Sequence, residues 1–313
     1  MGEKLVIALG GNALQKKDSD YTAEEQLLVI KDTVKKIAEL VEDGYDVTIV
    51  HGNGPQVGRI LLQQEESKNV TPMMPLDVCG AMSQGYIGYQ LAQCLHDELL
   101  KKNINKSVTA VLTQVVVDSN DRAFRNPTKP IGAFYTKDEA KKLKKEKGYV
   151  LKEDSNRGYR RVVASPIPQE IVELETIKKL SEDSIVITCG GGGIPVTKDD
   201  KGHLNGIECV IDKDFAAGVL ASALDARYLL ILTDVAYVYT GFKSQNPLAI
   251  KRMNVSEAER HFLHGEFGIG SMLPKVEAAM KFVKGNEGRK AIITSLEKAV
   301  DAMHDNAGTI IVR

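Results

Sequence analysis

The sequence predicts an α/β protein, a three-layer αβα sandwich with an open, mainly parallel central sheet and a small protruding subdomain. Short runs rich in Val, Ile and Leu alternate with amphipathic helical segments, and these runs are apolar almost throughout. Such strands are typical of parallel sheets that carry helices on both faces. A polar segment, residues 119–165, interrupts the alternation and predicts the subdomain.

The N-terminal half is expected to begin with a strand at residues 4–9, which ends in Gly-Gly. A helix should follow, because Thr22 and Glu25 form a capping box and Gly44 ends the apolar periodicity. The patterns further along this half predict strands at residues 46–50 and 108–117 and, between them, a long amphipathic helix at residues 77–100.

The C-terminal half continues the alternation without an internal sequence repeat. Its apolar runs predict strands at residues 185–188, 228–232, 291–294 and 309–312. Its periodic segments predict helices near residues 215–224 and 274–284.

The polar segment carries its own local signals. Thr136 and Glu139 form a second capping box, which predicts a helix at residues 137–147, and a short hairpin is expected around residues 149–163. A run of lysines is interpreted as a solvated face, the alternative being a subdomain that closes over a site: Lys141, Lys142, Lys144, Lys145 and Lys147. Lys129 differs from this run because it is held between two nearby prolines at the base of the segment.

Composition excludes several classes of protein. The 313 residues carry 41 basic and 42 acidic side chains, a formal net charge of −1, whereas nucleic-acid-binding domains usually carry a strong basic excess. Trp is absent and there are only 7 Phe and 10 Tyr, which disfavours base-stacking platforms. No run approaches the ~18 apolar residues of a membrane span, and the run Leu5–Leu9 is too short for a secretory leader. The four cysteines lack metal-ligand spacing and are expected to be free, buried thiols, which favours the cytoplasm.

Glycine clusters end three of the predicted strands, at residues 10–12, 52–54 and 190–193. In an open α/β sheet, ligands bind beyond the carboxyl ends of the strands. Glycine lets backbone N–H groups approach an anion closely, and a following helix N-terminus adds a favourable dipole. The clusters therefore predict an anion site, the alternative being that each serves a tight turn. Neither a Walker A loop nor the Gly-x-Gly-x-x-Gly fingerprint is present, which disfavours a nicotinamide enzyme.

Three lysines are candidates for binding that anion: Lys129, and Lys213 and Lys275 at predicted helix starts. A lysine is poorly placed at a helix N-terminus, because the helix dipole favours acidic groups there. An anionic ligand would explain the mismatch, whereas each lysine taken alone reads as a surface residue. Asp214 is expected either to orient the lysine ammonium groups or to cap a helix.

His51 stands at the end of the second predicted strand. A histidine at such a position is interpreted first as a hydrogen-bonded structural residue and second as a substrate contact or proton carrier. Cys189 abuts the four-glycine run, and its role stays open.

Six blocks of the sequence together resemble carbamate kinases. They run in family order over essentially the whole chain: residues 7–13 (IALGGNA), 51–58 (HGNGPQVG), 126–132 (NPTKPIG), 189–195 (CGGGGIP), 211–216 (IDKDFA) and 270–275 (GSMLPK). The Gly-Gly pair alone is shared with every amino-acid kinase. Ala8 occupies the position at which acetylglutamate, aspartate and uridylate kinases usually carry a lysine. The absence of that lysine, together with Lys129 in the protruding segment, separates carbamate kinases from those relatives.

The resemblance implies an amino-acid kinase fold with an eight-stranded sheet, a homodimer, and reversible phosphoryl transfer between ATP and carbamate. Mg²⁺ would accompany the nucleotide and be held mainly by its phosphates rather than by protein side chains. The N-terminal lobe, residues 1–210, would bind carbamate or carbamoyl phosphate, with residues 119–165 as a lid. The C-terminal lobe, residues 211–313, would bind ATP or ADP. The family usually forms ATP from carbamoyl phosphate in arginine fermentation.

The resemblance also implies roles for individual residues. Lys129, Lys213 and Lys275 would surround the transferred phosphoryl group, and Asp214 would organise the lysines. The cradle for carbamate and phosphate would consist of Gly10, Gly11, Asn12, Gly52, Asn53, Gly191 and Gly192. The nucleotide would contact Lys213, Thr233, Asp234, Tyr237, Met272 and Lys275, with Phe242 as a further candidate for the adenine.

Two other functions stay open at this point. The chain could be another amino-acid kinase that phosphorylates a small carboxylate, or a non-catalytic nucleotide-binding module built on the same sheet. The set of three lysines with Asp214 argues against the binding module, which has no need for all of them.

Overall fold

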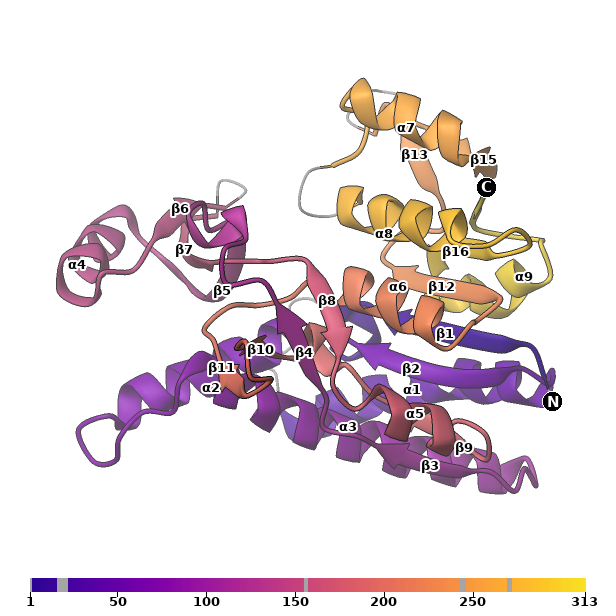
Figure 1. The fold of residues 1–313 in the computed structure, drawn as a ribbon, viewed down its shortest axis with the longest axis horizontal. Helices are drawn as coiled ribbons and strands as arrows, with labels where there is room; N and C mark the ends of the chain where they lie inside the picture. The colour runs from indigo at the N-terminus through magenta and orange to yellow at the C-terminus, as the bar shows by residue number, and fades with distance from the viewer. Residues whose placement is uncertain (1, 16–21, 155–156, 243–245, 269–271) are drawn as a thin grey trace.

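A computed structural model describes residues 2–15, 22–154, 157–242, 246–268 and 272–313 (Figure 1). Its largest sheet has eight strands, and all neighbouring pairs except β16–β17 are parallel. The expectation of an open, mainly parallel central sheet is therefore confirmed. The strand order is β15 (Arg252–Asn254), β17 (Thr309–Val312), β16 (Lys290–Ser295), β12 (Tyr228–Thr233), β1 (Lys4–Leu9), β2 (Asp46–His51), β9 (Ser184–Ile187), β3 (Ser107–Ala110).

Helices cover both faces of this sheet. Side chains alternate between the faces along a strand, so Leu5, Ile7 and Leu9 of β1 lie in one buried cluster and Val6 and Ala8 in another. The first cluster packs against α1 (Ala23–Glu42), α3 (Leu76–Lys101) and α9 (Ala299–Met303); the second packs against α5 (Leu174–Leu180), α6 (Lys213–Ala223), α7 (Val255–Leu263) and α8 (Leu273–Lys284). The molecule is a three-layer sandwich, as the sequence predicts.

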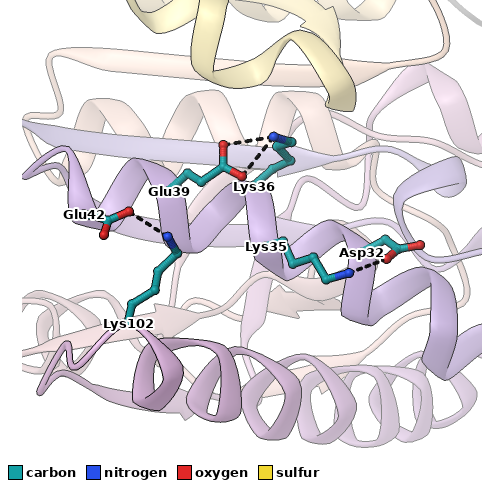
Figure 2. Close-up of polar contacts among 6 residues, drawn as sticks. All are labelled: Asp32, Lys35, Lys36, Glu39, Glu42 and Lys102. Atoms are coloured by element: carbon teal, nitrogen blue, oxygen red, sulfur yellow. Dashed lines mark hydrogen bonds and ion pairs between the residues drawn. The ribbon is translucent and has the colours of Figure 1, made fainter.

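Polar contacts add to the packing of α1 beside α3 (Figure 2). Lys102, which follows α3, pairs with Glu42 at the end of α1 at 2.7 Å. Asp32 pairs with Lys35 and Glu39 with Lys36 within α1, at 2.9 Å in each case. Thr22 begins the helix by accepting the Glu25 N–H, which is one half of the predicted capping box.

The expected strand at residues 108–117 is wrong, because two strands in different sheets occupy it. β3 ends at Ala110, and β4 (Gln114–Val117) joins a four-stranded sheet of order β11 (Leu204–Gly206), β10 (Ile194–Lys198), β4, β8 (Pro168–Ile171). Thr113 turns the chain between them, since its N–H donates to Gln84 on α3 at 2.9 Å and its hydroxyl contacts Thr188 at 2.7 Å. Buried side-chain bonds from distant elements thus replace the strand ladder at this point.

The polar segment forms a separate small unit that projects from the main body (Figure 1). Its three antiparallel strands have the order β5 (Lys129–Tyr135), β7 (Tyr159–Val163), β6 (Leu151–Glu153), with α4 (Lys137–Lys147) between β5 and β6. The capping box at Thr136 and the bounds of α4 are as predicted. The unit packs against α2 (Gly54–Ser67), where Glu65 accepts hydrogen bonds from Lys147 and Tyr149.

Two remaining expectations concern membrane segments and cysteines. Among the residues whose structure is described, no helix is both long enough and apolar enough to cross a membrane. Cys79, Cys94, Cys189 and Cys209 are free and buried, as the sequence predicts.

The sequence patterns missed several elements. They include the helices α2, α5 and α7, most of the four-stranded sheet, and the hairpin of β13 (Val238–Thr240) with β14 (Leu248–Ile250).

Candidate active site

The three glycine clusters meet at one edge of the central sheet. They follow β1, β2 and β9, which are neighbouring parallel strands, so their carboxyl ends lie side by side. The Gly52 N–H donates to the Leu9 carbonyl at 3.0 Å, which joins the first cluster to the second. Gly191 joins the second cluster to the third: its φ of +67° is left-handed, and a Cβ placed there would lie 2.2 Å from the Asn53 amide nitrogen. A side chain at Gly191 would therefore collide with Asn53.

Two of the predicted lysines bind one buried carboxylate next to the clusters. Asp214 accepts a hydrogen bond from Lys213 at 2.5 Å through one oxygen and from Lys275 at 2.9 Å through the other. Lys213 starts α6 and Lys275 lies in the first turn of α8, and these two helices pack side by side. The stem of Lys213 also lies 3.3 Å from where a Cβ on Gly52 would stand, so this lysine borders the second glycine cluster.

Burial and the neighbouring charges act in opposite directions on the pKa values of this triad. Burial alone would raise the pKa of Asp214, but the charges of Lys213 and Lys275 outweigh it and hold that pKa below its ordinary value. Burial lowers the pKa of Lys213 more than Asp214 raises it. Burial also acts to lower the pKa of Lys275, but Asp214 reverses the effect and the net shift is upward. The site thus presents two ammonium groups that share a single counter-charge.

The third predicted lysine reaches the same place through a residue that the sequence interpretation missed. Lys129 donates to Asp212 at 2.7 Å, across 83 positions of sequence. Asp212 is also the N-cap of α6, because its other oxygen accepts the Asp214 N–H at 3.0 Å. The capping role considered for Asp214 therefore belongs to Asp212. An aspartate directly before a helix start is a strong N-cap signal and could have identified it.

A cleft of about 480 Å³ opens beside the lysines. Seven of the residues predicted for the site line it: Gly10, Gly11, Lys213, Thr233, Asp234, Met272 and Lys275. Phe242 lines it as well. Tyr237, the tyrosine predicted for the site, does not line the cleft, but Tyr239 does. The ring centroids of the two tyrosines lie 6.4 Å apart. Glu266, Phe267 and Gly268 contribute a wall from the loop after α7 that carried no sequence signal.

Asn12 lies at the back of this cleft. It lines a smaller hollow that shares Gly10, Thr233 and Asp234 with the main cleft. Gly192, in contrast, packs against the main chain just before Asp212, since a Cβ on it would lie 2.3 Å from the Ile211 carbonyl oxygen. Gly52, Asn53, Gly191 and Gly192 thus form the floor beside the lysines rather than the wall of the main cleft.

His51 and Cys189 have no accessible reactive atoms. Burial lowers the pKa of His51 to about 4, even though its Nδ1 contacts the Gly52 carbonyl at 2.8 Å. Burial likewise raises the pKa of the Cys189 thiol to about 12. Both groups are therefore neutral near pH 7, which agrees with a structural role for His51.

The cleft also has the chemistry that a magnesium nucleotide requires. Asp234 and Glu266 supply carboxylates to its lining, opposite in charge to Lys213 and Lys275. Within the described ranges there is no cluster of three or more His, Cys, Asp or Glu side chains able to hold a metal ion. The two lining carboxylates are oxygen donors of the kind that Mg²⁺ prefers, so the donor set fits a divalent cation.

Comparisons with known proteins show the family of the chain. The amino acid kinase family model matches residues 3–295. The chain is 54% identical to the carbamate kinase of Clostridium perfringens over 99% of this chain and 100% of that protein, and 49% identical to the one from Pyrococcus horikoshii over 99% of each. The structure of carbamate kinase from Giardia lamblia bound to AMP-PNP superposes with a TM-score of 0.92 at 42% identity, covering 99% of this chain and 98% of that one.

These relatives confirm the resemblance drawn from the six sequence blocks. Identities near 50% extend over the full chain, and the structural similarity covers 99% of this chain. The chain therefore belongs to the amino acid kinase family, as a member of its carbamate kinase group.

Proposed function

We propose that this chain is a carbamate kinase that transfers a phosphoryl group reversibly between ATP and carbamate. The observation that carries the proposal is the shared carboxylate of Asp214, which holds Lys213 and Lys275 together between the glycine clusters and the cleft. Such a pair of cations, fixed before any ligand arrives, suits a reaction in which negative charge must be gathered at one point.

The nucleotide is proposed to occupy the cleft. Its volume and its partly aromatic lining suit an adenosine, with Tyr239 and Phe242 available to the base. Thr233, Asp234 and Met272 line the same space, and Lys213 and Lys275 face the phosphates from its inner end. The Giardia relative is a complex with AMP-PNP, which supports a nucleotide as a ligand. Tyr237 stays a predicted contact, with Tyr239 the better placed of the two.

Carbamate is proposed to bind on the floor formed by the glycine clusters. Gly10, Gly11 and Asn12 border the phosphate end of the cleft, and Gly52 and Asn53 lie next to Lys213. Gly191 and Gly192 complete this cradle. Backbone N–H groups free of a Cβ can approach an anionic oxygen closely.

The chemistry then follows from charge. Carbamate already carries an anionic oxygen at neutral pH, so no general base is required, and neutral His51 need not act as one. Phosphoryl transfer depends mainly on positioning and electrostatic stabilisation. Lys129, Lys213 and Lys275 offset the repulsion between the two anions, and Asp214 keeps the last two aligned. Mg²⁺, bound mainly to the nucleotide phosphates with Asp234 nearby, would supply further positive charge.

Residues 119–165 are proposed to act as a lid over this site. Lys129 stands where β5 begins, and its bond to Asp212 joins the projecting unit to the helix that carries Lys213. The unit rests on α2, whose N-terminus follows the second glycine cluster. Its movement would therefore change the distance between Lys129 and the other lysines.

We also propose a cytoplasmic homodimer that works in the ATP-forming direction. An exposed apolar stripe on α3, which includes Val78, Met82 and Tyr89, supports the dimer, with Leu28 of α1 exposed as well. Four unpaired cysteines fit a reducing compartment. The direction, and a role in arginine fermentation, rest on the family resemblance.

One assay tests the proposed activity. Purified protein is given ADP, Mg²⁺ and carbamoyl phosphate, and ATP is followed by luciferase; parallel reactions offer ATP with carbamate, acetylglutamate or UMP. We expect ATP to form from ADP and carbamoyl phosphate. In the reverse direction, we expect ATP to phosphorylate carbamate but neither acetylglutamate nor UMP. Lys213→Ala is the inactive control, and Lys281→Ala, an exposed lysine on α8, is its matched active control. Phosphorylation of acetylglutamate or UMP would identify a different amino-acid kinase, and nucleotide binding without turnover would identify a binding module.

A further inference from the structure

Asp212 makes two different connections with one carboxylate. Its Oδ1 accepts the Asp214 N–H at 3.0 Å and so caps α6. Its Oδ2 accepts a hydrogen bond from the Lys129 ammonium at 2.7 Å. The side chain of Asp212 is 13% exposed and that of Lys129 33%, so solvent only partly screens the pair. The helix that begins with Lys213 and the strand that begins with Lys129 are therefore tied at a single residue.

Main-chain bonds bring these two residues together from both sides. Lys129 pairs in register with Val163, where the projecting unit leaves and re-enters the main body. The next residue, Ala164, accepts a hydrogen bond from the Val210 N–H at 3.0 Å, two positions before Asp212. Asp212 thus stands at the junction of the unit with the main body, and its contact with Lys129 is part of that junction.

The charges around the junction show why a carboxylate is needed there. Lys129, Lys213 and Lys275 contribute three positive charges, of which Asp214 contacts the last two. Lys129 has Asp212 as its ion-pair partner. An ammonium group has three donors, so the bond to Asp212 leaves donors that can turn toward a phosphoryl oxygen. A flexible four-carbon stem is thereby held in place before the ligand arrives.

The geometry points to Asp212 as a positioning residue that holds Lys129 at the phosphoryl-transfer site while fixing the start of α6. This assignment rests on the proposed kinase function and extends it, since Asp212 acts through Lys129 rather than on the substrate. It also gives Asp212 and Asp214 different hydrogen-bond partners: the first binds the lysine of the projecting unit and the second binds the two lysines of the main body, although the charge of Asp212 also acts to raise the pKa of both main-body lysines.

Asp212→Asn separates the two tasks of the carboxylate. Asparagine caps helices as well as aspartate does, so the bond to the Asp214 N–H is retained, whereas the ion pair with Lys129 is lost. The matched control is Asp225→Asn, which removes an ion pair with Arg289 beyond the other end of α6, outside the cleft. We expect kcat for ATP formation to fall about 10- to 100-fold in Asp212→Asn, with KM for ADP within about twofold of wild type. The control should match wild type in both.

A double variant tests whether Asp212 works through Lys129. Lys129→Met alone should lower kcat, and adding Asp212→Asn should lower it no further, because the partner is already gone. If Asp212→Asn lowers kcat of the Lys129→Met protein by the same factor by which it lowers kcat of wild type, the assignment is overturned. An Asp212→Asn protein with wild-type kcat would overturn it equally.

Hydrogen exchange supplies a readout that does not depend on turnover. In Asp212→Asn the amides at the base of the projecting unit, residues 129, 131 and 161–164, should exchange several-fold faster, while those of α6 stay unchanged. Faster exchange throughout α6 instead would show that Asp212 is only a helix cap. If wild type and Asp225→Asn both fail to use carbamoyl phosphate, the proposed function fails by itself, and the exchange result still decides whether Asp212 holds Lys129.

Discussion

Lys275 donates a hydrogen bond to Asp214 at 2.9 Å, although the two residues are 61 positions apart in the sequence. The same carboxylate binds Lys213 from its own helix at 2.5 Å. The contact therefore joins the N-termini of α6 and α8 at the cleft and places two cations at one point. Helix dipoles make both helix starts unfavourable places for lysine, so the buried aspartate is what allows the pair to stand there.

Removing Lys275 should impair catalysis much more than folding. In Lys275→Ala, Asp214 keeps Lys213 as its partner, so the buried carboxylate stays compensated. The loss of one aligned donor typically lowers kcat by about 10²–10³. Steady-state ATP formation measures the effect, with circular dichroism as the test of folding and Lys281→Ala on the same helix as the control. A folded Lys275→Ala protein with normal kcat would contradict the assignment.

Asp214→Asn should instead destabilise the fold, because two buried ammonium groups then share no counter-charge. Removing one partner of a buried ion pair costs about 3–5 kcal/mol in the free energy of unfolding. The pKa of Asp214 is held below its ordinary value, so its stabilising effect is present above about pH 4 and is lost as the pH falls further. Urea unfolding at pH 7, 4 and 3 should show the difference from wild type shrinking toward the lowest pH. A difference that grows on acidification would have the wrong sign.

His51 should make the protein less stable in mild acid. Its pKa is about 4 in the fold, against an ordinary value near 6.5, so between these values the unfolded chain binds the extra proton. The free energy of unfolding should therefore fall by about 3 kcal/mol from pH 6.5 to pH 4 through this residue. His51→Gln should flatten that part of the pH profile relative to wild type. Equal slopes in the two proteins would exclude His51 as the cause.

Shortening the projecting unit tests the lid. Tyr135 and Tyr159 are partners in register on β5 and β7, so residues 136–158 can be replaced by a four-residue Gly-Ser turn that keeps Lys129. We expect the affinity for ADP, measured by calorimetry, to stay near wild type, because none of the described residues of the unit lines the cleft. Use of carbamoyl phosphate should fall at least tenfold in kcat/KM, on the order expected for lost positioning. Unchanged kcat/KM would mean that residues 136–158 have no part in the reaction.

Two tyrosines allow the nucleotide placement to be tested with a matched pair. Tyr239 lines the cleft and Tyr237 does not, although their rings lie 6.4 Å apart. Stacking of a base on an aromatic ring contributes about 1–3 kcal/mol, so Tyr239→Ala should raise KM for ADP about tenfold or more. Tyr237→Ala should change it less than twofold. If Tyr237→Ala raised KM for ADP more than Tyr239→Ala did, the adenine would contact Tyr237, as the sequence predicts.

Local sequence patterns predicted much of this molecule correctly. The strand at residues 4–9 and the helix at residues 137–147 have the expected bounds, because apolar runs and capping boxes act between neighbouring residues. The glycine clusters were placed correctly as well, since parallel strands bring their carboxyl ends to one edge. The prediction failed where side chains from distant elements compete with the local pattern. At Thr113, a hydrogen bond to Gln84 directs the chain away from the predicted strand.

The sequence by itself determined the class of fold, the glycine-lined edge of the sheet and the choice of the three candidate lysines. Each of these predictions depends on a pattern among neighbouring residues. Only the tertiary structure decided how the lysines are shared between carboxylates. Asp212 and Asp214 are two positions apart, yet one binds Lys129 and the other binds Lys213 and Lys275. That division depends on where β5 and α8 come to lie beside α6, and long-range packing, which no local pattern contains, sets those positions.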